Sequence, residues 1–264
     1  MTFDIWVQDQ QIIIDKLNIN YKIAGKGRCI LILHGWGSSS ERWQETAKIL
    51  SQAGFKVVVP DLPCFGKSVE PPFGWSVGDY AEFVLKFAKE LNLDKFFLIG
   101  HSFGGRIAIK LGAVYPEKIQ GLILVGAAGI ESARGFKSKI FLFLAKLGNS
   151  LFSLPLLKKL YPRARKTIYL LARTKDYFEA EGVRKEIFKK VISEDLTTFL
   201  SQIKTPTLLI WGKKDRLTPL KHGYLMKEKI PNSTLEVIPN FGHALNLECP
   251  QKLATAIIKW LKTL

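Results

Sequence analysis

A serine in the segment GHSFG, at residues 100–104, is the side chain best placed to do chemistry. The apolar run KFFLIG before it, 95–100, has the length of a buried strand, and 103–115 has the spacing of a helix. Flanking glycines allow a sharp strand-to-helix turn that exposes the serine at its tip and aims helix amide groups at developing negative charge. The alternative is a serine that only caps the helix. We therefore expect Ser102 to act as a nucleophile in acyl transfer.

A carboxylate and a histidine follow two later apolar runs. Asp215 comes just after the run TPTLLIW, and His243 comes after the short strand predicted at 234–238. In a serine hydrolase a histidine removes the serine proton and a carboxylate orients that histidine. For Asp215 the alternative is a surface aspartate in a basic loop. We expect a catalytic triad of Ser102, Asp215 and His243, and assign structural or surface roles to His101 and His222.

Elements able to position these residues alternate regularly along the chain. Continuous apolar runs that alternate with helical patterns predict a parallel sheet covered on both faces. The predicted strands are 29–34, 55–61, 95–100, 120–126, 205–211 and 234–238, after an antiparallel start at 3–7 and 18–24. The predicted helices are 41–53, 76–92, 103–115, 219–230 and 250–264. Residues 127–200 break the alternation because their pattern is helical without strands, which is typical of an inserted cap.

The order Ser102, Asp215, His243, each past a predicted strand, resembles the α/β-hydrolase superfamily with a serine nucleophile. The resemblance implies an α/β fold with a mostly parallel eight-stranded sheet flanked by helices and a helical cap inserted after the sixth strand. We accordingly divide the chain into a core, 1–126 and 201–264, and a cap, 127–200. The HGWG segment at 34–37 resembles the family's oxyanion loop, which implies that the amides of Trp36 and Phe103 form the oxyanion hole.

Four residues near this loop are predicted to bind substrate: His34, Gly35, Cys64 and Phe65. His34 has the alternative role of a structural histidine that braces the loop. Cys64 stands where relatives usually carry glycine, so it is either a small tolerated residue or a thiol whose alkylation would block the site. The predicted substrate is a carboxylic ester or related acyl compound with an apolar acyl part, and no metal or organic cofactor is required.

Several other functions stay open. Haloalkane dehalogenases and epoxide hydrolases of this fold use an aspartate nucleophile, so Ser102 argues against both. Thioester or lactone hydrolysis, and hydrolysis of a carbon–carbon bond in dienoate ring-cleavage products, suit a serine. The HGWG loop followed by Trp43 also resembles, over a few residues, esterases that act on acyl groups attached to an acidic carrier. A ligand-binding or sensing protein on the same fold is the alternative from another class, although a pure binder needs no base.

The charge of the chain suggests an acidic partner. The formal net charge is +16, and residues 131–175 alone hold eleven Lys or Arg against one acid, which is +10. Basic and apolar residues interleaved in this part of the cap suit an acidic carrier protein or an anionic membrane surface, although a solvated face is the alternative. No nucleic-acid module is recognisable. Three widely spaced cysteines and the lack of an export signal predict a cytoplasmic protein.

Overall fold

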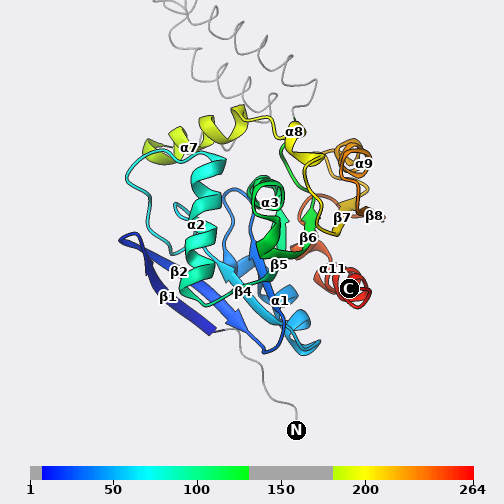
Figure 1. The fold of residues 1–264 in the computed structure, drawn as a ribbon, viewed down its shortest axis with the longest axis horizontal. Helices are drawn as coiled ribbons and strands as arrows, with labels where there is room; N and C mark the ends of the chain where they lie inside the picture. Colours follow the sequence, from blue (N-terminus) through cyan, green and yellow to red (C-terminus); the bar gives the residue numbers. More distant parts are fainter. Residues whose placement is uncertain (1–7, 131–180) are drawn as a thin grey trace, which may run out of the picture.

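The computed structural model describes residues 8–130 and 181–264, which form an eight-stranded sheet in the order β1-β2-β4-β3-β5-β6-β7-β8 (Figure 1). β1 pairs antiparallel with β2, and β2 antiparallel with β4, whereas the pairs from β4 to β8 are parallel. The expected mostly parallel sheet is therefore confirmed. The strands are β1 (Gln8–Ile14), β2 (Leu17–Ala24), β3 (Cys29–Leu33), β4 (Lys56–Pro60), β5 (Phe96–His101), β6 (Ile119–Val125), β7 (Thr207–Gly212) and β8 (Ser233–Ile238).

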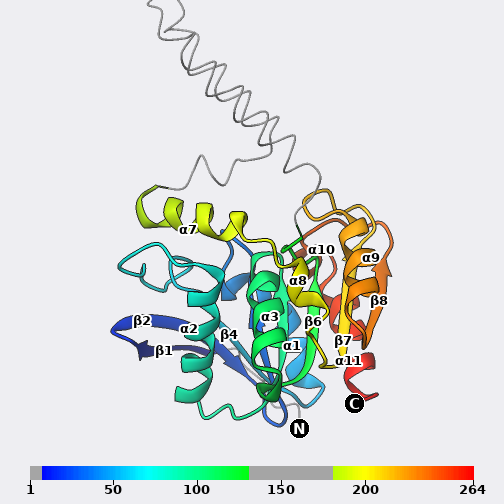
Figure 2. The same ribbon diagram turned by 45° about the horizontal axis from the view of Figure 1, so that its top comes forward.

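Helices cover both faces of this sheet, as Figures 1 and 2 show. All five residues of β3 are buried, and their alternation divides the core into two layers. Leu31 and Leu33 pack in the layer of α2 (Val77–Glu90) and α3 (Phe103–Val114). Ile30 and Ile32 pack in the layer of α1 (Gln44–Gln52) and α11 (Pro250–Leu261). A continuous apolar strand is thus explained by burial on both sides.

The first edge of the sheet differs from the prediction. Residues 3–7, predicted as a strand, lie outside the described residues, and the edge strand is β1 instead. The first four residues of β1 are exposed and polar, so its hydrophobic pattern is weak. A short helix, α10 (Leu245–Glu248), was also not predicted. The other predicted strands agree with the structure to within about two residues.

Of the predicted cap, 127–200, the structure describes residues 127–130, which hold no helix or strand, and 181–200, which contain α7 (Gly182–Ser193) and α8 (Thr197–Leu200). Residues 131–180, including the whole basic stretch 131–175, lie outside the described residues, so the domain limits and the acidic partner stay predictions. α7 lies over the same end of the molecule as the start of α3 (Figure 2). None of the described helices is long and apolar enough to cross a membrane.

The connection between β4 and α2, residues 61–76, helps to position α7. Arg184 of α7 donates a hydrogen bond to the carbonyl oxygen of Cys64 at 2.9 Å, and Lys190 donates one to the carbonyl oxygen of Gly74 at 2.5 Å. On the other side, Lys110 of α3 pairs with Glu194 at 2.9 Å. α7 is therefore attached both to the β4–α2 connection and to α3, the helix that follows Ser102.

Candidate active site

Ser102 occupies a strained turn between β5 and α3. Its backbone has φ 51° and ψ −110°, a region that residues other than glycine rarely adopt. It is the N-cap residue of α3, yet its side chain makes no capping hydrogen bond, so capping does not account for the serine. A Cβ atom on Gly104 would lie 2.1 Å from the carbonyl oxygen of Leu33. The glycine therefore lets α3 start directly against β3, which fixes where Ser102 sits.

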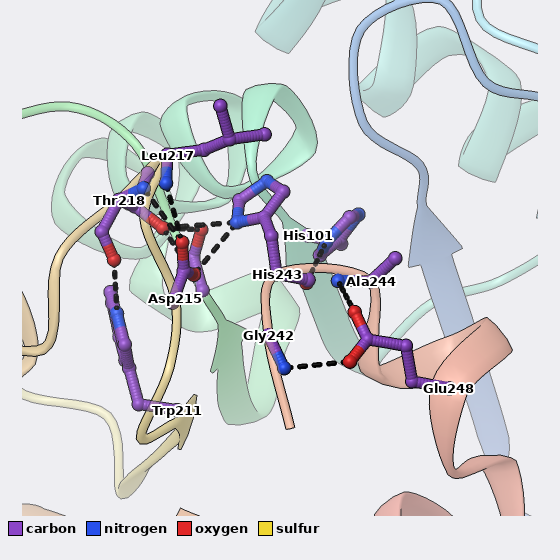
Figure 3. A network of polar contacts seen from close by, with 10 residues as sticks. His101, Trp211, Asp215, Leu217, Thr218, Gly242, His243, Ala244 and Glu248 are labelled. Carbon is purple, nitrogen blue, oxygen red and sulfur yellow. Dashed lines mark hydrogen bonds and ion pairs between the residues drawn. The ribbon is translucent and has the colours of Figure 1, made fainter. Parts of the chain in front are cut away.

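Asp215 and His243 form a hydrogen-bonded pair at the ends of neighbouring strands. The Nδ1 atom of His243 lies 2.7 Å from Oδ2 of Asp215 (Figure 3). The Asp215 side chain is fully buried, and its Oδ1 atom accepts the amide hydrogens of Leu217 at 2.8 Å and Thr218 at 2.9 Å. A charged acceptor held by two backbone donors has one orientation, so the pair fixes the imidazole in turn.

The environment of Asp215 keeps it ionised. Burial acts to raise the pKa of this carboxyl, but the hydrogen bond and charge of His243 and the hydrogen bonds from Thr218 outweigh it. The net result is a pKa below the usual value. An ionised Asp215 accepts the Nδ1 proton of His243, which leaves Nε2 of the imidazole as the basic nitrogen.

Thr218 is a site residue that the sequence analysis missed. Its hydroxyl oxygen lies 2.8 Å from Oδ2 of Asp215, 2.9 Å from the carbonyl oxygen of Gly126, and 3.2 Å from Nδ1 of His243. Its carbonyl oxygen accepts the indole N–H of Trp211 at 2.8 Å. The spacing D-x-x-T, in which an aspartate receives the amide of the third residue along, is the signal that could have indicated it.

The structure brings the Ser102 turn next to the His243 loop. His101, adjacent to Ser102 in the chain, places its ring 4.9 Å from the ring of His243, centre to centre. A Cβ atom on Gly35 would lie 3.3 Å from Cβ of Ser102 and 3.0 Å from Nδ1 of His101. The three predicted triad residues and the predicted oxyanion loop therefore meet at the carboxyl ends of β3, β5, β7 and β8.

The two amides predicted for the oxyanion hole lie on segments tied to each other. The amide of Gly104 donates to the carbonyl oxygen of His34 at 3.1 Å, which joins the loop after β3 to the start of α3. Phe103 is the first residue of α3, so its amide has no intrahelical partner. Among the hydrogen bonds of the described residues, none uses the amide of Trp36 or Phe103 as donor. The oxyanion hole itself stays a prediction.

The predicted substrate-binding residues separate into two kinds. Both ring nitrogens of the fully buried His34 are used: Nδ1 donates to the carbonyl oxygen of Gly35 at 2.8 Å, and Nε2 accepts the amide of Leu62 at 3.0 Å. Burial lowers the pKa of His34. These contacts match the bracing alternative and leave no ring nitrogen for a substrate. Phe65, by contrast, packs 4.9 Å from Trp36, beside the oxyanion loop.

The backbone at Cys64 explains why relatives usually carry glycine at this position. Its φ angle is 81°, in the left-handed region that favours glycine. The side chain is 1% exposed, and its thiol donates to a carboxylate oxygen of Glu70 at 3.6 Å. Burial also raises the thiol pKa, so little of it is the reactive thiolate. These observations favour a tolerated small residue over an exposed reactive thiol.

His101 makes the stability of the protein depend on pH. Burial, and then the nearby charge of His243, lower its pKa from 6.5 to about 3. Between these values the unfolded chain binds a proton that the folded chain does not, so stability falls as the pH falls. The slope is at most about 1.4 kcal/mol per pH unit for one such group.

We expect the His101→Gln variant to lose less unfolding free energy than the wild type between pH 6.5 and pH 4, because glutamine does not titrate. Urea unfolding monitored by tryptophan fluorescence at several pH values measures this difference. Parallel pH profiles for the two proteins would contradict a neutral, buried His101.

In residues 8–130 and 181–264, no group of three or more His, Cys, Asp or Glu side chains is arranged to hold a metal ion.

The comparisons with known proteins give the family. Residues 29–250 match the family described as the α/β hydrolase fold. The chain belongs to this family. It is an enzyme of the hydrolase class, because its named relatives are hydrolases.

Two relatives and one further structure illustrate the similarity. The chain is 30% identical over 248 residues to a 2-hydroxy-6-oxononadienedioate/2-hydroxy-6-oxononatrienedioate hydrolase of Pseudomonas putida, which covers 86% of each chain. It is 26% identical to a membrane phospholipase A described as a bacterial virulence factor, with a TM-score of 0.76, over 97% of this chain and 86% of the other. The structure of a meta-cleavage product hydrolase has a TM-score of 0.72 at 21% identity, over 97% of this chain and 98% of the other.

Proposed function

We propose that this α/β hydrolase is a serine hydrolase that forms an acyl-enzyme on Ser102. The proposal rests on the hydrogen bond between Nδ1 of His243 and Oδ2 of Asp215, 2.7 Å long, which lies beside the strained Ser102 turn. Strained backbone geometry of this kind concentrates at functional sites. A ligand-binding or sensing protein would need neither an oriented base nor an exposed nucleophile.

In the proposed mechanism His243 removes the Ser102 proton as the hydroxyl attacks the acyl carbon. The amides of Trp36 and Phe103 bind the oxyanion, and each such donor contributes about 3 kcal/mol to lowering the barrier. His243, now cationic and facing the ionised Asp215, protonates the leaving group. Water, deprotonated by His243, then attacks the acyl-enzyme and releases the acid, which restores Ser102.

Aromatic side chains around the proposed oxyanion loop support a substrate with an apolar acyl part. The Trp36 ring makes edge-to-face contacts with Phe65 at 4.9 Å, Phe103 at 5.5 Å and Phe188 of α7 at 4.9 Å, centre to centre. Pockets for small molecules are lined mainly by such side chains, with a few polar groups that fix orientation. The phospholipase A relative is by its name an ester hydrolase, which supports a carboxylic ester as the substrate.

A second candidate reaction is the hydrolysis of a carbon–carbon bond in a dienoate. The Pseudomonas putida relative and a 2-hydroxy-6-oxo-6-phenylhexa-2,4-dienoate hydrolase of Burkholderia cepacia, 27% identical, favour it. Such a substrate carries a carboxylate, for which a cationic side chain is the natural partner. Arg184, the arginine beside Phe65, donates one hydrogen bond to the carbonyl oxygen of Cys64, and its buried Nε atom makes none among the described residues. We keep the ester as the first candidate because of the aromatic side chains around Trp36 and the phospholipase A relative.

The purified protein can be given both substrate classes under the same conditions. We expect p-nitrophenyl esters of medium-length acids to be hydrolysed with a kcat/KM at least about tenfold above that of 2-hydroxy-6-oxo-6-phenylhexa-2,4-dienoate, a difference of about 1.4 kcal/mol in barrier. A fluorophosphonate should label Ser102. Faster turnover of the dienoate would establish the second candidate reaction, and the absence of both turnover and labelling would contradict a serine hydrolase.

A further inference from the structure

The loop that carries His243 is held on both sides of the histidine by one carboxylate. The Oε2 atom of Glu248, on α10, accepts the amide of Gly242 at 2.6 Å, and its Oε1 atom accepts the amide of Ala244 at 3.1 Å (Figure 3). The two residues that flank His243 therefore share a single charged acceptor. Both hydrogen bonds are exposed to solvent, but a carboxylate is a strong acceptor and the two bonds together restrain the loop on either side of His243.

The carbonyl group of His243 itself is held from the opposite side. Nε2 of His101 lies 3.0 Å from this oxygen. A carbonyl oxygen can only accept, so Nε2 of His101 carries the hydrogen and the ring is in one tautomer. His101 is 7% exposed and belongs to the Ser102 turn. The hydrogen bond therefore links the turn of the nucleophile directly to the backbone of the base.

We propose that Glu248 and His101 are positioning residues that together hold the backbone of His243 so that its Nε2 faces Ser102. This proposal rests on the proposed function. Asp215 sets the rotation of the His243 ring through Nδ1, but it cannot fix where the backbone that carries the ring lies. Glu248 and His101 supply that second restraint through three successive residues, 242 to 244. A displacement of about 1 Å between reacting groups can cost about 100-fold in rate.

The two residues allow graded substitutions. Glu248→Ala removes both acceptors, whereas Glu248→Gln keeps one carbonyl oxygen and therefore one of the two amide contacts. His101→Phe removes the donor, whereas His101→Gln can present an N–H group in place of Nε2. Glu236→Ala is the matched control, because Glu236 is an exposed carboxylate on the neighbouring strand β8.

The test measures ester hydrolysis per active site, with competent molecules counted by fluorophosphonate titration. We expect Glu248→Ala and His101→Phe to lower kcat by about 10- to 100-fold with KM changed less than about twofold, because positioning acts on the chemical step. Glu248→Gln should fall between wild type and Glu248→Ala, and His101→Gln should restore most of the activity lost in His101→Phe. Equal kcat per site in Glu248→Ala, His101→Phe and the Glu236→Ala control would overturn the proposal.

A second readout keeps the proposal testable without turnover. The proton on Nδ1 of His243, shared with Asp215, should give a downfield proton resonance in the folded wild type. We expect that resonance to broaden or shift in Glu248→Ala and to stay unchanged in Glu236→Ala. If the wild type hydrolyses no ester but the resonance still changes in Glu248→Ala and not in Glu236→Ala, the proposed hydrolase function is rejected and the positioning role is supported. An unchanged resonance in Glu248→Ala would reject the positioning role, even if His101→Phe fails to fold.

Discussion

The Ser102→Ala variant is expected to lose ester hydrolysis by a factor on the order of 10⁵ to 10⁶ in kcat, because the nucleophile and its base act as a unit. The oxyanion donors are backbone amides and survive the substitution, so a small residual rate over water should remain. The fold should be unaffected, because the Ser102 side chain makes no capping hydrogen bond. Steady-state kinetics and thermal unfolding of the same preparation measure both expectations.

The control for this experiment is Ser76→Ala. Ser76 caps α2, where its hydroxyl accepts the amide of Asp79 at 3.2 Å, so its loss should lower stability by about 1 kcal/mol while activity is kept. The two serines should thus show opposite patterns. Esterase activity in Ser102→Ala that matches the wild type would refute Ser102 as the nucleophile.

The Asp215→Asn variant is expected to lower kcat by about 10⁴-fold while leaving the fold intact. Its single side-chain oxygen should keep the two amides of Leu217 and Thr218, which Oδ1 now accepts. The new NH₂ group would then face Nδ1 of His243, which must become an acceptor. The imidazole proton would move to Nε2, the nitrogen that has to take the Ser102 proton.

Asp215→Ala separates this tautomer effect from a loss of structure. It removes the acceptor of the two amides as well, so its unfolding temperature should fall, whereas that of Asp215→Asn should stay near wild type. The two variants should therefore differ in unfolding temperature but share a low kcat, and thermal unfolding and steady-state kinetics measure these two quantities. Near wild-type kcat in a folded Asp215→Asn protein would argue against the assigned role of Asp215.

The sheet was predictable, and the three residues of the proposed triad could be selected, because the signals for both are local. Ser102 lies in a glycine-bearing turn, Asp215 follows the fully buried strand β7, and His243 follows the half-buried strand β8. The edge strand β1 was not predictable, because its polar first half lacks the hydrophobic pattern of a strand.

The residues around the triad were missed for a different reason, since their roles depend on how the loops are arranged in three dimensions. His101 contacts the carbonyl group of a residue 142 positions away, and nothing in its own segment indicates this. Thr218 and Glu248 lie close in sequence to the groups they hold, but which of the many threonines and glutamates receives such a role depends on the loop geometry. The glycine that relatives usually carry at position 64 could not be explained from the sequence, because the positive φ angle that favours it is a property of the folded loop.

The backbone conformation at Ser102 implies a trade-off between thermal stability and catalytic activity in this protein. A φ angle of 51° with ψ −110° suits glycine better than any residue with a side chain, so the nucleophile occupies a position that folding alone would assign otherwise. Selection for thermostability without a screen for activity would therefore favour glycine at this position. Mutant libraries designed to raise the thermal stability of the enzyme should therefore leave Ser102 unchanged. Stabilising substitutions should be sought at exposed surface positions such as those of β1.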